Sequence, residues 1–160
     1  MSIAHSTTDL IKALDTAFTY DDTVLLEEYI KGTEITVAII GNQSLEALPI
    51  IEIVPSEKYA FFDYHAKYTA GETKEICPAR ISEELTQSAF ELAKKAHAAM
   101  FCKGYSRTDM IIKDNDIYVL ETNTIPGMTA SSLLPLAAEK AGMNFGQLID
   151  RLIELGQEER

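Results

Sequence analysis

The chain has 160 residues, of which 46% are hydrophobic, and its formal net charge is −11. This length fits one domain or a large part of a bigger protein, and the apolar fraction suffices for a core, which excludes general disorder. The acidic balance argues against nucleic acid or an anionic membrane as a general partner. A phosphate ligand would therefore need a few placed cations, backbone N–H groups or metal ions.

Nothing in the sequence indicates secretion, a membrane span or a zinc site. The opening residues, MSIAHSTTDL, lack the basic and apolar regions of a signal peptide, and no apolar run approaches the roughly 20 residues that cross a bilayer. Cys77 and Cys102 lie far apart, and the three histidines are scattered without metal-ligand spacing. We therefore expect a cytoplasmic protein with reduced thiols that contacts neither membrane nor nucleic acid.

The first part of the chain predicts one helix and then a meander. Ser6 is a suitable N-cap for a helix whose apolar face carries Leu10, Ile11, Leu14 and Phe18. Residues 23–30, 34–40 and 45–54 are β-rich and separated by turn residues, which predicts three antiparallel strands. Pro49 in the third run fits only an edge or a bulge.

Residues 55–80 show no clear periodicity. A loop of this length inside a compact chain is either functional or evidence against the assignment, and its aromatic and lysine content favours a lid. The alternative is a packed satellite cluster of the aromatic residues Tyr59, Phe61, Phe62 and Tyr64.

The remainder predicts a helix, a hairpin and two more helices. Ser82 caps a helix that runs to about residue 101. Strands follow at 105–113 and 117–123, and helices lie near 132–141 and 145–155. This order of elements is typical of an α+β fold with a mainly antiparallel sheet and packed helices.

The hairpin of about residues 105–123 predicts a polar cluster. If residues 114–116 form a loop of three residues, Asp109 faces Glu121 and Arg107 faces Asn123. Side chains alternate along a strand, so all four then project from one side, whereas a two-residue loop would break the cluster.

This cluster has the chemistry of a divalent-cation site. Two opposed carboxylates at roughly 5 Å repel each other unless a cation neutralises them. Asp109, Glu121 and Asn123 offer only oxygen ligands, a set that suits Mg²⁺ or Mn²⁺ rather than zinc. Arg107 cannot deprotonate and would serve an anion. The alternative is an exposed sheet face on which Arg107 is a plain counterion.

The residues after the hairpin, TIPGMTASSLLP, suggest an anion site. Gly127 allows the backbone to approach a ligand closely. Ser131 or Ser132 would lie at a helix N-terminus, whose N–H groups and dipole attract a carboxylate or phosphate. An ordinary N-cap serine is the alternative.

Together these motifs resemble the D-alanine–D-alanine ligases of the ATP-grasp superfamily. The resemblance covers nearly the whole chain. It rests on Arg107-x-Asp109 and on LETNTIPGMTASSLLP, EEYIKGTEITVAI, PIIEI, FFDYHAKYTAG and CPARI, in the family's order. It implies the C-terminal domain of an ATP-grasp ligase.

The resemblance implies roles for the metal and nucleotide residues. Asp109, Glu121 and Asn123 would hold two magnesium ions, with Glu121 bridging and manganese as a substitute. Lys67 would contact the phosphates of ATP, and Tyr68 would lie in a mobile loop that closes over the site. The segment beginning at Glu27 would read adenine through the backbone of Tyr29 and Ile30, and Glu34 would bind the ribose. From the residues alone, Lys67 could equally be a solvated lysine, and Glu27 and Glu34 surface acids.

The resemblance also implies the reaction. ATP would phosphorylate the carboxylate of one D-alanine, and the amine of a second would attack the acyl phosphate, giving D-alanyl-D-alanine for peptidoglycan. Arg107 and the N–H of Gly127 would stabilise charge at the reacting carbonyl. Ser132 and the N–H of Leu133 would hold the carboxylate of the second D-alanine.

Family members carry a further N-terminal half with the first D-alanine site, nucleotide-binding lysines and a Gly/Ser-rich phosphate loop. We expect this substrate domain to be absent from residues 1–160, and the chain alone to be inactive without that half as a partner. A homodimer is implied by the resemblance. The alternatives are an isolated Mg-nucleotide half-site without turnover, and a ligase with another second substrate, such as D-lactate.

Overall fold

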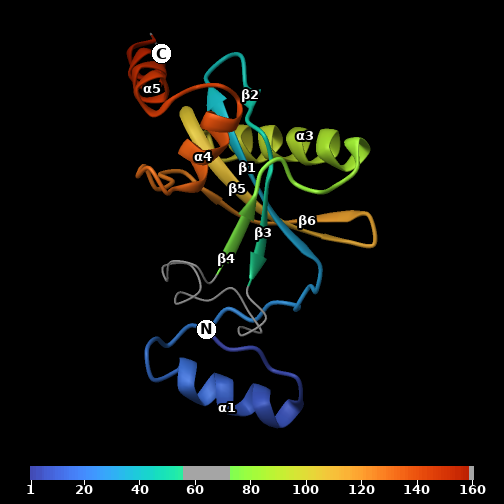
Figure 1. Cartoon of the computed structure of the whole chain (residues 1–160). Helices are drawn as coiled ribbons and strands as arrows, with labels where there is room; N and C mark the ends of the chain where they lie inside the picture. The colour runs from blue at the N-terminus through green and yellow to red at the C-terminus, as the bar shows by residue number, and fades with distance from the viewer. Residues whose placement is uncertain (56–72, 159–160) are drawn as a thin grey trace.

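The computed structural model describes residues 1–55 and 73–158 (Figure 1). The elements in chain order are α1 (Thr7–Ala17), β1 (Thr33–Gly41), β2 (Glu46–Ala47), β3 (Ile51–Pro55), β4 (Thr73–Ile76), α3 (Glu83–Ala99), β5 (Gly104–Lys113), β6 (Asp116–Asn123), α4 (Leu133–Lys140) and α5 (Phe145–Gln157). In this part of the chain, no helix has the length and apolar character needed to cross a membrane.

One antiparallel sheet organises the described residues. Its strand order is β4-β3-β1-β5-β6, and the short β2 also pairs with β1. The helix α3 covers one face, while α4 and α5 pack on the other face and gather at one end of the sheet (Figure 1). The expected α+β fold with a mainly antiparallel sheet and packed helices is therefore confirmed.

The central strand β1 separates two apolar cores. Ile35, Val37 and Ile39 pack towards α3, where Ala89 and Ala93 are fully buried. The alternate residues of β1 point to the opposite face, where Ala38 and Ile40 join a core built with α4 and α5. The second face is covered by helices only in part, and its uncovered part carries the polar residues described below.

Helix starts follow the predicted caps. The side chain of Ser6 accepts a hydrogen bond from the N–H of Asp9, and that of Ser82 accepts one from the N–H of Leu85. The helix α1 has no buried residue and lies apart from the sheet (Figure 1). Its predicted apolar face is therefore covered only in part: Leu10 and Leu14 are half-buried, while Ile11 and Phe18 are 56% and 55% exposed.

The expected first strand, residues 23–30, is wrong. The segment forms no ladder, and its Leu25 and Leu26 side chains are 80% and 66% exposed. The physical reason is a missing partner: β1 is the next strand along the chain, and β3 and β5 already occupy its two edges. The segment therefore has no edge of β1 with which to pair.

Two further corrections concern the following residues. The run expected at 45–54 is split into β2 and β3, because Pro49 has no N–H to give to a ladder. Within the expected loop of residues 55–80, residues 73–76 form β4 against β3. Residues 56–72 of that loop, with the expected lid and its aromatic residues, lie outside the described part.

The hairpin keeps the expected facing pairs by a different route. Lys113 pairs with Asp116, so the turn has two residues, Asp114 and Asn115, both with positive φ (52° and 70°), as in hairpin turns of type I′. That turn alone would set Asp109 opposite Leu120. A bulge skips Leu120, so that Asp109 faces Glu121 and Arg107 faces Asn123. The expected three-residue loop is wrong, but the expected cluster survives.

Candidate functional site

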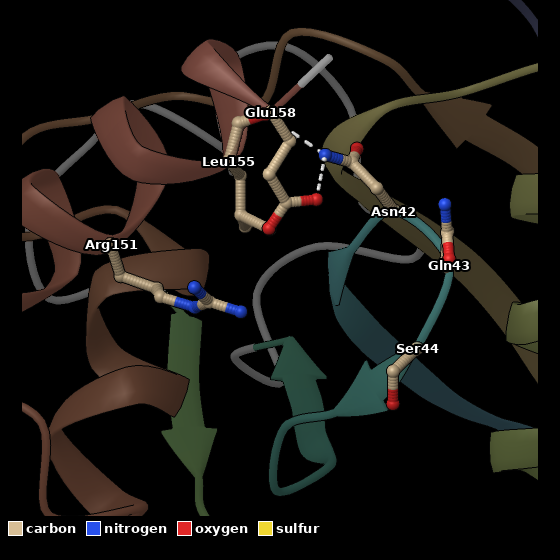
Figure 2. A pocket seen from close by; sticks show the side chains of 6 residues that line it. All are labelled: Asn42, Gln43, Ser44, Arg151, Leu155 and Glu158. Carbon is tan, nitrogen blue, oxygen red and sulfur yellow. Dashed lines mark hydrogen bonds between the residues drawn. The ribbon is translucent and has the colours of Figure 1, made fainter. Parts of the chain in front are cut away.

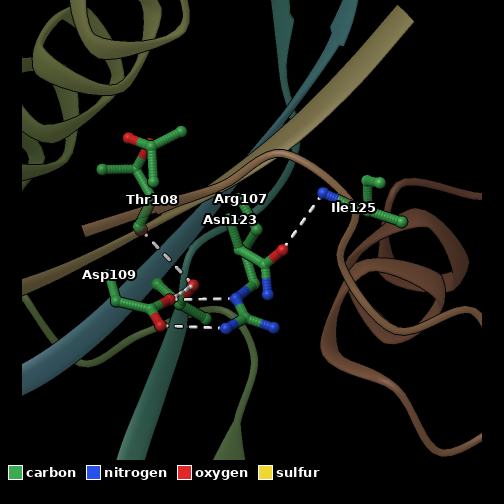
Figure 3. A network of polar contacts seen from close by, with 7 residues as sticks. Arg107, Thr108, Asp109, Asn123 and Ile125 are labelled. Atoms are coloured by element: carbon green, nitrogen blue, oxygen red, sulfur yellow. Dashed lines mark hydrogen bonds and ion pairs between the residues drawn. The ribbon is translucent and has the colours of Figure 1, made fainter. Parts of the chain in front are cut away.

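The polar cluster lies on the sheet face opposite α3, on the strands β5 and β6. Arg107 and Asp109 are half-buried residues of β5 that project from one face, while Ser106, Thr108 and Met110 of the same strand are buried on the other. The guanidinium of Arg107 binds the carboxylate of Asp109 through two bonds, Nε to Oδ1 and Nη2 to Oδ2, both 2.9 Å long (Figure 3). This bidentate geometry is the strongest form of a side-chain ion pair.

A third strand contributes to the same carboxylate. Thr36 of β1 pairs with Asp109 in the β1–β5 register, and its hydroxyl donates to Oδ1 of Asp109 at 2.6 Å. Thr36 is only 3% exposed. Sequence reasoning missed this residue, because only the pairing of strands more than 70 residues apart brings it to the site. The position of Thr36 in the motif EEYIKGTEITVAI was the one available signal.

Glu121 and Asn123 complete the cluster on β6. Glu121 is exposed and faces Asp109 across the strand pair, and Asn123 is half-buried and faces Arg107. The side-chain Oδ1 of Asn123 accepts a hydrogen bond from the N–H of Ile125 at 3.1 Å (Figure 3). The four residues expected to share one face therefore do so.

The segment after β6 forms a compact turn before α4. A Cβ added to Gly127 would lie 2.9 Å from the Oγ of Ser132, so only glycine fits there without displacing that side chain. Ser132 is the N-cap residue of α4, but its Oγ makes no cap bond and instead accepts from the N–H of Thr129 at 3.0 Å. The sequence therefore predicted the position of Ser132 correctly, and the ordinary capping alternative is wrong for its side chain.

The structure describes only some of the residues that are expected to bind the nucleotide. Glu27, Tyr29 and Ile30 lie in the unpaired segment before β1, and Glu27 is exposed. Glu34 is half-buried on β1, on the same face as Thr36 and two residues from it. Lys67 and Tyr68 lie outside the described residues.

The cluster fits a cation that takes few protein ligands. Its donors are the carboxylates of Asp109 and Glu121 and the amide oxygen of Asn123, an oxygen-only set that suits Mg²⁺. No group of three or more His, Cys, Asp and Glu side chains comes together within the described ranges, so water and phosphate would complete the shell. Arg107 already compensates Asp109, however, so repulsion between carboxylates alone does not demand a metal.

A separate hollow of about 430 Å³ lies at the far end of β1 (Figure 2). Asn42 donates there to the carbonyl of Leu155 at 2.9 Å and to the Glu158 carboxylate at 2.8 Å. Six residues of strand separate Asn42 from Thr36, roughly 20 Å. The bonds of Asn42 tie the C-terminus of α5 to the end of β1, and the hollow takes no part in the polar cluster.

The groups whose pKa values are shifted lie away from the polar cluster. Hydrogen bonds from Arg80 lower the pKa of the Glu52 carboxyl, and burial lowers the pKa of the His97 imidazole. Burial also raises the pKa of the thiols of Cys77 and Cys102, both of which are free. These shifts therefore belong to the packing of the fold.

Comparison with known proteins shows similarity over nearly the whole chain. The family described as "D-ala D-ala ligase C-terminus" matches residues 1–154. The D-alanine–D-alanine ligase of Syntrophobacter fumaroxidans is 57% identical over 159 residues, which is 99% of this chain and 51% of that protein. A D-alanine–D-alanine ligase structure from Bacillus anthracis, complexed with ATP, is 40% identical with a TM-score of 0.80, covering 96% of this chain and 49% of that one. The VanG D-Ala:D-Ser ligase of Enterococcus faecalis is 36% identical with a TM-score of 0.78, covering 94% and 43%.

The antiparallel sheet, its helices and the polar hairpin define a C-terminal part of the ATP-grasp ligase fold. The chain belongs to the D-ala D-ala ligase C-terminus family. It spans about half the length of the curated relatives that it matches.

Proposed function

We propose that this chain forms the metal- and nucleotide-binding half of a D-alanine–D-alanine ligase. The observation that supports this most strongly is the β5–β6 register, which sets Asp109 against Glu121 and Arg107 against Asn123 on one open sheet face. The same residues lie within the family match. The bulge that sets these facing pairs also supports the proposal, because β-bulges are over-represented next to active sites.

Asp109, Glu121 and Asn123 are the residues that we assign to two magnesium ions, with manganese as a substitute. Magnesium bound there would neutralise the charge of ATP phosphate groups. Glu34, on the same face as Thr36, is assigned to binding of the ribose. The segment that begins at Glu27 is assigned to binding of the adenine. Lys67 is assigned to the phosphates and Tyr68 to the closing of the site, and both lie outside the described residues.

The remaining residues act on the amino acids. Arg107 lies beside the proposed metal site and supplies a fixed positive charge for the reacting carbonyl. The N–H of Gly127 shares this role. The N-terminus of α4 lacks a side-chain cap from Ser132, so its N–H groups are assigned to the carboxylate of the second D-alanine. ATP would activate the first D-alanine as an acyl phosphate, and the second amine would then displace the phosphate.

We propose that this chain acts together with the other half of a ligase. Curated relatives are about twice as long, and the chain exposes apolar side chains in its unpaired segment, among them Tyr20 (86%) and Leu25 (80%). Burial of these side chains against a partner would be favourable by about 25 cal/mol per Å² of apolar surface removed from water. We propose that the N-terminal half covers this segment and completes the first D-alanine site. Location in the cytoplasm and assembly as a homodimer stay predictions.

Two alternatives remain: a half-site that binds Mg-ATP without turnover, and a ligase with another second substrate. An isolated half-site would bind Mg-ATP without any reaction. A ligase with another second substrate would use D-lactate, and the similarity to a D-Ala:D-Ser ligase adds D-serine to the compounds worth testing.

The test is phosphate release from Mg-ATP, measured with the 160-residue chain alone and with a chimera. The chimera carries the N-terminal half of the 57% identical relative ahead of residue 1. We expect D-alanine-dependent release from the chimera and none from the chain alone. Phosphate release only with D-lactate or D-serine would identify that compound as the second substrate. Mg-ATP binding without phosphate release would favour the half-site. Turnover by the chain alone would contradict the proposed dependence on a second half.

A further inference from the structure

We propose that Thr36 is a positioning residue for the cation site, a role that depends on the proposed function of the hairpin. Thr36 lies on the strand next to Asp109, on the side opposite to Glu121. The three residues form one row across β1, β5 and β6. The row places a neutral hydroxyl donor and a carboxylate on either side of the central carboxylate.

Counting lone pairs shows what the hydroxyl of Thr36 does. A carboxylate has about four acceptor positions, two on each oxygen. Oδ1 of Asp109 accepts from Nε of Arg107 at 2.9 Å and from the Thr36 hydroxyl at 2.6 Å, so both its positions are filled. Oδ2 accepts from Nη2 of Arg107 at 2.9 Å. Among the described contacts, one position remains open, and it is on Oδ2.

Thr36 therefore selects the oxygen that can bind a cation. Without its hydroxyl, Oδ1 would have an open position of its own, and the carboxylate would be held by Arg107 alone. With the hydroxyl, the carboxylate is fixed from two directions by groups on two strands. Outer contacts of this kind set the orientation of a metal ligand, and their loss typically costs 10- to 100-fold in metal affinity.

Thr36 itself is held firmly enough for this role. It is 3% exposed, its strand is paired on both edges, and its hydroxyl also lies 3.4 Å from the carbonyl oxygen of Thr108. As a β-branched residue in a central strand, it has few rotamers available. The hydroxyl is thus a rigid donor rather than a mobile surface group.

The test uses Mn²⁺ as the probe and the 160-residue chain as the protein. Paramagnetic broadening of backbone amide signals, measured by NMR during a Mn²⁺ titration, reports binding residue by residue. The variants are Thr36→Val, which removes the donor at nearly constant shape, and Thr36→Ser, which keeps it. Thr122→Val is the matched control, because its hydroxyl bonds to Thr108 at 3.1 Å on the other face of the same hairpin.

We expect broadening around Asp109, Glu121 and Asn123 in the wild type. Thr36→Val should raise the Mn²⁺ dissociation constant by about tenfold or more, while Thr36→Ser and Thr122→Val stay near the wild-type value. An unchanged dissociation constant in Thr36→Val would overturn the positioning role and leave the proposed cation site in place. Absence of broadening at the hairpin in the wild type would overturn both.

Discussion

Arg107 holds both oxygens of Asp109 from a position two residues away on the same strand, with two bonds of 2.9 Å. The pair is mostly shielded, with side chains 13% and 22% exposed. Because residues i and i+2 of a strand share a face, this ion pair is local to β5. The β-sheet then adds Thr36 on one side and Glu121 on the other.

Replacing Arg107 by alanine should destabilise the fold, because the Asp109 carboxylate loses two charge-assisted hydrogen bonds in a shielded position. We expect a loss of about 2 kcal/mol in the free energy of unfolding, measured by urea denaturation at neutral pH. Arg151→Ala is the control, since its ion pair with Glu154 is exposed and worth at most about 1 kcal/mol. Equal losses of unfolding free energy in the two variants would show that the pair with Asp109 stabilises the fold no more than an exposed ion pair.

Replacing Gly127 by alanine should displace Ser132. The new Cβ would approach the Ser132 Oγ to 2.9 Å, and rotation of that side chain would break its bonds to Thr129. We expect a loss of about 1 kcal/mol in unfolding free energy and, in the chimera, a raised KM for D-alanine. In Gly156→Ala the added Cβ meets no atom within 4 Å inside α5, so that variant should gain up to about 1 kcal/mol. Gain in both variants would contradict the crowding at Gly127.

Acid should weaken the fold through His97 before the carboxylates titrate. His97 is 2% exposed, its Nδ1 lies 2.7 Å from the Ser106 hydroxyl, and burial lowers the pKa of its ring. In the unfolded chain a histidine takes up a proton below about pH 6.5, which the folded chain resists. The unfolded state then binds more protons, so stability is present above that pH and is lost as the pH falls below it.

The measurement is the free energy of unfolding between about pH 7 and pH 5. The wild type and His5→Gln, whose residue is exposed, should show the same decline. His97→Asn should start less stable and lack that part of the decline. A decline of equal slope in His97→Asn would assign the pH dependence to other groups.

The Arg80–Glu52 pair should contribute stability at neutral pH and lose it in acid. Glu52 is 6% exposed and accepts three hydrogen bonds from Arg80, one from its backbone N–H and two from its guanidinium, which lower the pKa of the Glu52 carboxyl. A lowered pKa means that the contribution exists above the ordinary carboxyl range and disappears as the pH falls through the folded-state pKa. Arg80→Ala should therefore lower the free energy of unfolding at pH 7 and lower it much less in strong acid. A cost independent of pH would contradict this origin.

Local chemistry made much of the fold predictable. The capping serines Ser6 and Ser82 mark the starts of α1 and α3, and the last two helices lie near their predicted residues. The facing pairs of the hairpin were predicted correctly although the loop length was wrong. The skipped Leu120 takes the place of the third loop residue, so the count along the chain still brings Asp109 to Glu121.

Non-local pairing set the limits of prediction. A β-rich composition at residues 23–30 cannot show whether a strand edge is free, and here β3 and β5 occupy both edges of β1. The short β4 lacks an apolar alternation and exists because β3 offers it an edge. Thr36 reads as one more β-branched strand residue until the β1–β5 register places it beside Asp109.

The central claim is that the hairpin carries the chemistry, and D-alanine-dependent phosphate release by variants of the chimera tests it most directly. Asp109→Asn keeps the shape of the side chain and removes the negative charge that we propose binds a magnesium ion. Asp116→Asn, on the exposed turn side of the same hairpin, is the control. We predict that Asp109→Asn lowers the rate by about 100-fold or more, or roughly 3 kcal/mol in activation free energy, while Asp116→Asn leaves it unchanged. A chimera that turns over normally with Asp109→Asn would contradict the account.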